Sequence, residues 1–171
     1  VVSGAIEELV RIGEQKSCIF AAAVLVEALT RAGVPGVVPL TVNVIIYNPA
    51  MTSRLGPKGL PPDDEKLADQ WEADGCRMMK IGDHGGPPRP GEWPVHLVVI
   101  VPNQFGDLPV MCDVTLPQAN KPDWGVELPP SVTKVSAKFV KDAECALVIK
   151  NGCRLMYKAF PSDRSFEASP A

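Results

Sequence analysis

At 171 residues the chain has the length of one domain. Hydrophobic residues make up 46% and charged residues 22% of it, so the sequence can bury a core and is of neither a disordered nor a fibrous type. The 17 Lys and Arg and 20 Asp and Glu give a net charge of -3. This balance argues against nucleic acid or an anionic membrane as the main partner. Small molecules and proteins remain as possible partners.

The cysteines indicate reduced thiols. All five occur without a CxxC pair, which favours neither a disulfide framework nor a zinc site. No apolar run reaches the ~18–20 residues that cross a bilayer, and the N-terminal residues do not read as a secretory signal. GxSxG, P-loop and GxGxxG patterns do not occur. We therefore expect a cytoplasmic location, no membrane association, no metal and no cofactor.

Two helices are expected first. Residues 5–15 place apolar side chains at helical spacing, which predicts a short amphipathic helix. Residues 18–32 (CIFAAAVLVEALTRA) are apolar on almost every face. Only Glu27 and Arg31 form an exposed i,i+4 pair, so this helix is expected to be centrally buried. Gly33 supplies its C-terminal stop.

A strand and a long excursion follow. Residues 40–47 (LTVNVIIY), bounded by prolines, predict a strand. Residues 48–94 are rich in Pro and Gly and contain one expected short helix at 64–71. We interpret them as an irregular excursion of a single domain covering residues 1–171, because long loops in compact domains often carry function.

The second half of the chain predicts antiparallel strands. Runs of β-forming residues stand at 95–101, 109–115, 135–140, 146–150 and 153–160. Asn151-Gly152 predicts a tight type I′ hairpin between the last two. The tail at 162–171 is expected to be mobile. Helices followed by antiparallel strands predict an α+β fold.

One histidine and one aspartate are the candidates for acid–base chemistry. Only two histidines occur, His84 and His96. If the strands at 95–101 and 109–115 pair around the centre of their turn, His96 faces Asp113, with Cβ atoms ~4.5–5.5 Å apart. A carboxylate that orients an imidazole is half of a catalytic triad. His84 has no second ligand at a metal-binding spacing and is expected to be a loop residue.

Cys18 is the candidate nucleophile. It stands in the first turn of the helix at 18–32, where the helix dipole and free N–H groups favour a thiolate. Its backbone N–H can donate to an oxyanion. A cysteine in an apolar helix is usually just a small buried hydrophobe, but its combination with His96 and Asp113 favours catalysis.

The segments around these three residues also resemble those of a known enzyme superfamily. The segment SCIFAAAVLVEALTRAGVPGVV resembles the nucleophile helix of transglutaminase-like, papain-like cysteine enzymes, and VHLVVIV and CDVTLPQ resemble their His and Asp strands. The resemblance covers roughly residues 16–118. It implies a Cys18, His96 and Asp113 triad on a papain-like α+β fold, with the nucleophile helix buried against an antiparallel sheet. Gln15 is a candidate oxyanion donor, and Trp93 a candidate wall of the cleft.

Hydrolysis is the expected reaction. Ser17-Cys18-Ile19 stands where animal transglutaminases have Gln-Cys-Trp, and the Arg-Gly-Gly-x-Cys motif of arylamine N-acetyltransferases is absent. We expect a cysteine protease or deamidase that cleaves a protein or peptide substrate, with specificity set by residues 48–94. Two alternatives stay open. One is acyl transfer to an amine, as in those two families, and the other is a non-catalytic protein-binding domain that uses the excursion.

Overall fold

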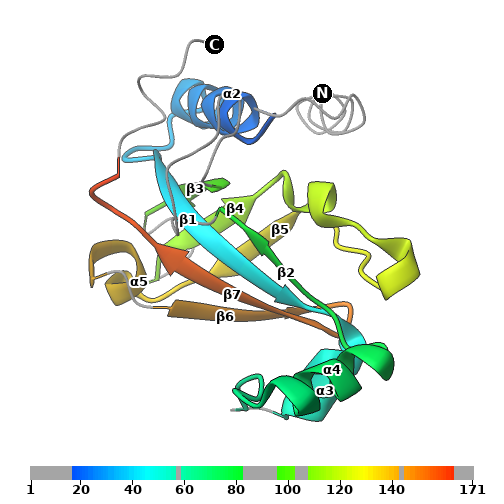
Figure 1. Cartoon of the computed structure of the whole chain (residues 1–171). Helices are drawn as coiled ribbons and strands as arrows, with labels where there is room; N and C mark the ends of the chain where they lie inside the picture. Colours follow the sequence, from blue (N-terminus) through cyan, green and yellow to red (C-terminus); the bar gives the residue numbers. More distant parts are fainter. Residues whose placement is uncertain (1–16, 57–58, 83–95, 103–107, 143–144, 164–171) are drawn as a thin grey trace.

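The computed structural model describes most of the chain. Its described ranges, to which every structural statement below refers, are 17–56, 59–82, 96–102, 108–142 and 145–163. Within them the fold is mixed α/β, built on one strongly twisted antiparallel sheet (Figure 1). The helix at Ser17–Arg31, labelled α2, lies at one end of the sheet, and two short helices lie at the other.

Seven strands form the sheet, in the order β5-β4-β3-β1-β7-β6, with β2 also paired to β1. They are β1 (Val38–Tyr47), β2 (Met78–Ile81), β3 (His96–Val101), β4 (Val110–Asp113), β5 (Ser131–Lys134), β6 (Cys145–Lys150) and β7 (Cys153–Ala159). All neighbours are antiparallel. The predicted strand at 40–47 and the predicted antiparallel sheet are thus confirmed.

Strand β1 organises the sheet. It pairs with β7, and it also pairs with β3 near its start and with β2 near its end. Val42 faces His96 of β3, whereas Val44 faces both Ile81 of β2 and Tyr157 of β7. Strands β2 and β3 therefore follow each other along the same edge of β1. The chain leaves this edge at Ile81 and returns to it at His96.

Alternate residues of the strands form the main core. Val42, Val44 and Ile46 of β1 are buried in one cluster with Val98 and Ile100 of β3. The intervening β3 residues face a second cluster beneath α2. This alternation follows from the two-residue period of a strand, and burial on both faces explains why the sequence of β3 is continuously apolar.

Helix α2 confirms the predicted helix at 18–32 but not its central burial. It covers the outer face of β3 with one side only, and Phe20 on the other side is 51% exposed. The Glu27–Arg31 ion pair is present, at 2.6 Å. At the C-terminus the Gly33 N–H donates to a carbonyl of the last turn, with φ of 80°. That left-handed conformation is why glycine ends the helix.

The excursion after β1 is more regular than we expected. Its described part contains α3 (Pro49–Leu55), α4 (Glu65–Ala73) and β2. Helix α4 confirms the predicted helix at 64–71. Helix α3 differs from the expected break at Pro49, because proline is favoured in the first turn of a helix, here directly after the cap residue Asn48.

The β3–β4 hairpin is confirmed, but its predicted register is wrong by two residues. Val99 pairs with Cys112 and not with Val110. The turn at 103–107 lies outside the described residues. An even shift keeps every side chain on its predicted face, since the side-chain period of a strand is two.

The predicted strand at 135–140 is wrong. Most of it forms α5 (Ala137–Asp142), and the adjacent strand is β5. The Ser136 hydroxyl accepts a hydrogen bond from the Phe139 N–H at 3.0 Å, which is the capping contact that starts a helix. The other hairpin prediction is confirmed, because Asn151 and Gly152 have φ of 47° and 76° between β6 and β7.

Some predictions fall outside the described residues. They are the helix at 5–15 and most of the tail at 162–171. Where the chain is described, no helix combines the length and apolarity that a membrane span needs.

Candidate active site

His96 and Asp113 form a buried hydrogen-bonded pair. His96 is the first residue of β3 and Asp113 the last of β4, and they are 2% and 0% exposed. The distance from His96 Nε2 to Asp113 Oδ1 is 2.9 Å. The contact predicted from the sequence is therefore present, although the observed register makes the two residues diagonal neighbours. Diagonal neighbours on one face remain within reach of a long side chain such as histidine.

Tyr157 donates a second hydrogen bond to this carboxylate. Its hydroxyl donates to Asp113 Oδ2 at 2.9 Å, and its side chain is fully buried on β7. Each carboxylate oxygen of Asp113 thus has its own partner, His96 on one side and Tyr157 on the other. Our sequence analysis did not single out Tyr157.

Closure of the sheet brings Tyr157 to Asp113. Strands β4 and β7 are separated by β3 and β1, so they stand three strand spacings apart. In a flat sheet that separation would be about 14 Å. A direct hydrogen bond requires the sheet to curl so that its interior side chains meet across the core.

Cys18 approaches the same pair from α2. It is the second residue of the helix and is 6% exposed. Cys18 lies close enough to the imidazole of His96 to be among the groups that raise its pKa, after Asp113. Because Nε2 is bound to Asp113, Nδ1 is the ring nitrogen left for the thiol. The three predicted site residues are therefore brought together.

The electrostatics favour a protonated imidazole. Burial opposes the charge on His96, but the charge and hydrogen bond of Asp113, followed by Cys18, raise its pKa from 6.5 to about 10. Burial and the negative Asp113 raise the pKa of Tyr157, so its phenol remains a hydrogen-bond donor. At neutral pH the carboxylate is thus held between two donors, one of which is charged.

This environment is absent at three other described cysteines, Cys112, Cys145 and Cys153. Cys112, next to Asp113 in the chain, lies on the opposite face of β4 and packs in the cluster beneath α2. Burial is the main cause that raises its pKa. Burial also raises the pKa of Cys153 in the core, whereas Cys145 is exposed. Together they provide internal standards for the reactivity of Cys18.

The described part of the excursion does not line this site. Helices α3 and α4 follow the far end of β1, at the opposite end of the molecule from α2 (Figure 1). His96 pairs with Val42, and Tyr47 lies five residues further along β1, which is about 17 Å. Helices α3 and α4 therefore lie away from Cys18, and the expectation that residues 48–94 set specificity stays a prediction. Residues 83–94 lie outside the described part.

Three further sequence candidates also lie outside the described residues. They are Gln15, Trp93 and His84. Across the described ranges, no three His, Cys, Asp or Glu side chains gather as metal ligands would.

Comparison of the chain with family models, with curated proteins and with solved structures returns no match in any of the three. What the site can do is therefore argued from its geometry.

Proposed function

We propose that the protein is a cysteine-dependent acyl-transfer enzyme that hydrolyses an amide, peptide or isopeptide bond. The observation that supports it is the contact of the Cys18 side chain, in the first turn of a helix, with an imidazole whose other nitrogen is bound to a buried carboxylate. A thiol, a protonated base and an orienting carboxylate are the groups that thiol-dependent acyl transfer requires.

The proposal includes a finer view of the fold. We infer a papain-like, transglutaminase-like arrangement, in which the nucleophile begins a helix and the base and the carboxylate follow on adjacent antiparallel strands. The chain order Cys18, His96, Asp113 and the packing of α2 on β3 support this view.

The reaction begins at sulfur. The Cys18 thiolate attacks the carbonyl carbon of the substrate, and the carbonyl electron pair moves onto oxygen as the C–S bond forms. When this tetrahedral oxyanion collapses, the C–N bond breaks and the amine departs with a proton from His96. A thioester on Cys18 and a neutral His96 remain.

Water completes the cycle. It attacks the thioester while His96 accepts its proton, and breaking of the C–S bond releases the acid and restores the thiolate and the imidazolium. Asp113 holds the orientation of His96 through both steps. The backbone N–H of Cys18, in the first turn of α2, is suited to bind the oxyanion, because the helix dipole favours negative charge there.

Selective alkylation tests the reactive thiol. Wild type and His96→Ala are treated with iodoacetamide at about pH 6, and labelling of each cysteine is followed by peptide mass spectrometry. We expect Cys18 to react faster than the exposed Cys145 despite its burial, and to lose this advantage in His96→Ala. Slow labelling of Cys18 that His96→Ala leaves unchanged would contradict catalysis and favour a non-catalytic binding domain.

A substrate screen separates the two acyl-transfer reactions. Fluorogenic peptide and amide substrates are incubated with wild type and with Cys18→Ala, with and without an added primary amine. Release of acid regardless of amine indicates hydrolysis, whereas incorporation of the amine into product indicates transfer. Turnover that survives in Cys18→Ala would contradict the proposed nucleophile.

A further inference from the structure

A second concave site lies at the end of the molecule opposite α2. Helices α3 and α4, the start of β2 and the short helix η2 (Pro122–Trp124) enclose a cavity of about 360 Å³. Its apolar walls include Met51, Pro61, Pro62, Trp71, Met78 and Trp124. The volume falls in the range of preformed ligand pockets, and the two indole rings offer large flat contact surfaces.

Asn48 holds the frame of this cavity together. Its Nδ2 donates to the carbonyls of Gly75 and Trp124, at 2.9 and 3.0 Å. Its Oδ1 accepts from the N–H groups of Met51 and Arg77, also at 2.9 and 3.0 Å. One buried side chain thus links α3, η2 and the segment between α4 and β2 with all four hydrogen bonds that it can make. The cavity is therefore preformed.

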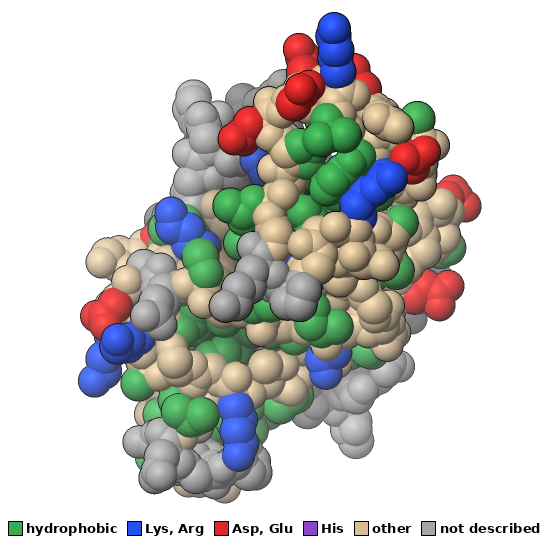
Figure 2. All heavy atoms as spheres, turned by 90° about the horizontal axis from the view of Figure 1, so that it is seen from below, with side chains coloured by type: hydrophobic (Ala, Val, Ile, Leu, Met, Phe, Trp, Pro, Cys, Tyr) green, Lys and Arg blue, Asp and Glu red, His purple; other side chains and the backbone are tan. Residues whose placement is uncertain are grey.

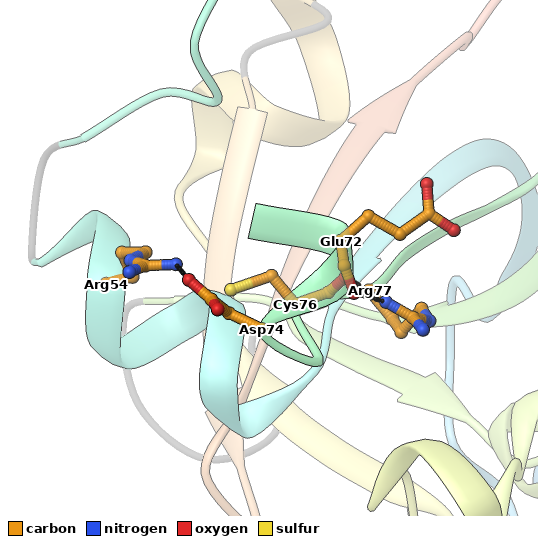
Figure 3. Close-up of polar contacts among 5 residues, drawn as sticks. All are labelled: Arg54, Glu72, Asp74, Cys76 and Arg77. Atoms are coloured by element: carbon orange, nitrogen blue, oxygen red, sulfur yellow. Dashed lines mark hydrogen bonds and ion pairs between the residues drawn. The ribbon is translucent and has the colours of Figure 1, made fainter. Parts of the chain in front are cut away.

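The arginines at this end are engaged in the frame (Figure 3). Arg54 binds the Asp74 carboxylate at 2.8 Å, and its guanidinium carbon stands 5.2 Å from the centre of the Trp71 ring. Arg77 Nη1 donates to the carbonyls of Glu72 and Cys76. These contacts fix Trp71 and the α4–β2 turn.

Apolar and acidic side chains gather around the opening. Leu67 and Met78 are 40% and 42% exposed, and Leu60, next to Pro61 in the chain, is 72% exposed. Residues 60–78 contain six acidic and two basic side chains, and Arg54 of α3 adds a third basic one. The acidic residues are Asp63, Asp64, Glu65, Asp69, Glu72 and Asp74. Figure 2, which views this end, shows hydrophobic side chains with acidic and basic side chains around them.

We propose that this surface, the α4 face, binds a protein segment in which a Lys or Arg stands next to a large apolar side chain. The apolar side chain enters the cavity between Trp71 and Trp124. The cation lies against the acidic side chains of Asp69 and Glu72, which are both exposed. Exposed apolar area surrounded by an excess of acidic side chains is typical of an interaction surface for a partner of the opposite sign. The proposal does not depend on the chemistry at Cys18.

Defined peptides test the partner chemistry. The probe is a fluorescein-labelled peptide of alternating Lys and Leu, and its binding is measured by fluorescence anisotropy. The matched controls are a Lys–Ser peptide, which keeps the charge, and a Glu–Leu peptide, which keeps the apolar side chains. We expect the Lys–Leu peptide to bind at least about tenfold more tightly than either control, with affinity falling as salt rises from about 50 to about 300 mM.

Variants locate the binding. Glu72→Lys and Leu67→Ser, both at exposed positions, should each weaken the Lys–Leu peptide about fivefold or more. The control Glu27→Lys makes the same charge reversal on α2 and should change affinity less than about twofold. Cys18→Ala should bind as wild type does.

Three results would overturn the proposal. One is equal binding of the three peptides. Another is an equal effect of Glu72→Lys and Glu27→Lys. The third is a dimer in light scattering that Leu67→Ser dissociates, because a second copy of this chain would then cover the α4 face.

Discussion

Tyr157→Phe tests whether the sheet supports the candidate site across its interior. The substitution removes one hydroxyl and keeps the aromatic ring in the core. Asp113 then retains its hydrogen bond to His96 but loses the one at Oδ2, whose length is 2.9 Å. Because the carboxylate is fully buried, water does not replace the lost donor without a rearrangement of the core.

The expected loss of stability follows from this geometry. A hydrogen bond to a charged group contributes about 1.5–3 kcal/mol, so we take about 2 kcal/mol for Tyr157→Phe. In a chain of 171 residues, each kcal/mol lowers the Tm by about 2–4 °C. The Tm should therefore fall by about 4–8 °C. Steady-state activity on a substrate found in the screen should also fall, because a less constrained Asp113 orients His96 less well.

Thermal and urea unfolding, followed by circular dichroism at neutral pH, measure the effect. Tyr47→Phe is the matched control, because Tyr47 is also buried but makes no hydroxyl hydrogen bond within the described residues. It should lower the free energy of unfolding by less than about 0.5 kcal/mol. If the two variants lose the same stability, the phenol does not support the carboxylate and our account of the pair is refuted.

Two further predictions concern charge and the cavity frame. The pKa of His96 is raised from 6.5 to about 10, so its contribution to stability is complete below about pH 6.5 and is lost as pH rises through about 10. The unfolding free energy from urea titrations should fall over this interval, and an unchanged slope in Asp113→Asn would contradict the coupling. Asn48→Ala removes four hydrogen bonds and should cost about 2–4 kcal/mol in the same titrations. Asn43→Ala, whose Oδ1 has no partner among the described residues, should cost less than about 1 kcal/mol, and equal losses would refute the role of Asn48.

Local signals account for what could be predicted of the site. The apolar run that forms α2 has the length of a helix, at 15 residues, whereas the short β-branched run of β3 is typical of a buried strand. Cys18 therefore falls at a helix start, and His96 and Asp113 at strand ends. The contact of the last two residues survives an error of two residues in register, because face parity alone brings them to one side of the hairpin.

Other elements depended on short-range chemistry that the hydrophobic pattern does not reveal. Residues 135–140 contain β-forming side chains, but the hydroxyl of Ser136 caps a helix there. Similarly, α3 begins at Pro49, although a proline after a strand indicates a break in regular structure. In each case one capping contact outweighs the secondary-structure propensities of a few residues. These propensities are small for each residue and become decisive only when they add up over a long segment.

By itself, the sequence determined the principal helix, most of the strands and the hairpin turn at Asn151-Gly152. It also determined the side-chain contact of His96 with Asp113. Each of these follows from residues close together along the chain. Only the tertiary structure decided that Tyr157 reaches Asp113 and that α3 and α4 lie far from Cys18. Both depend on how a twisted sheet curls and on the direction in which β1 carries the chain. Those are properties of all the strands packed together, and no local run of residues encodes them.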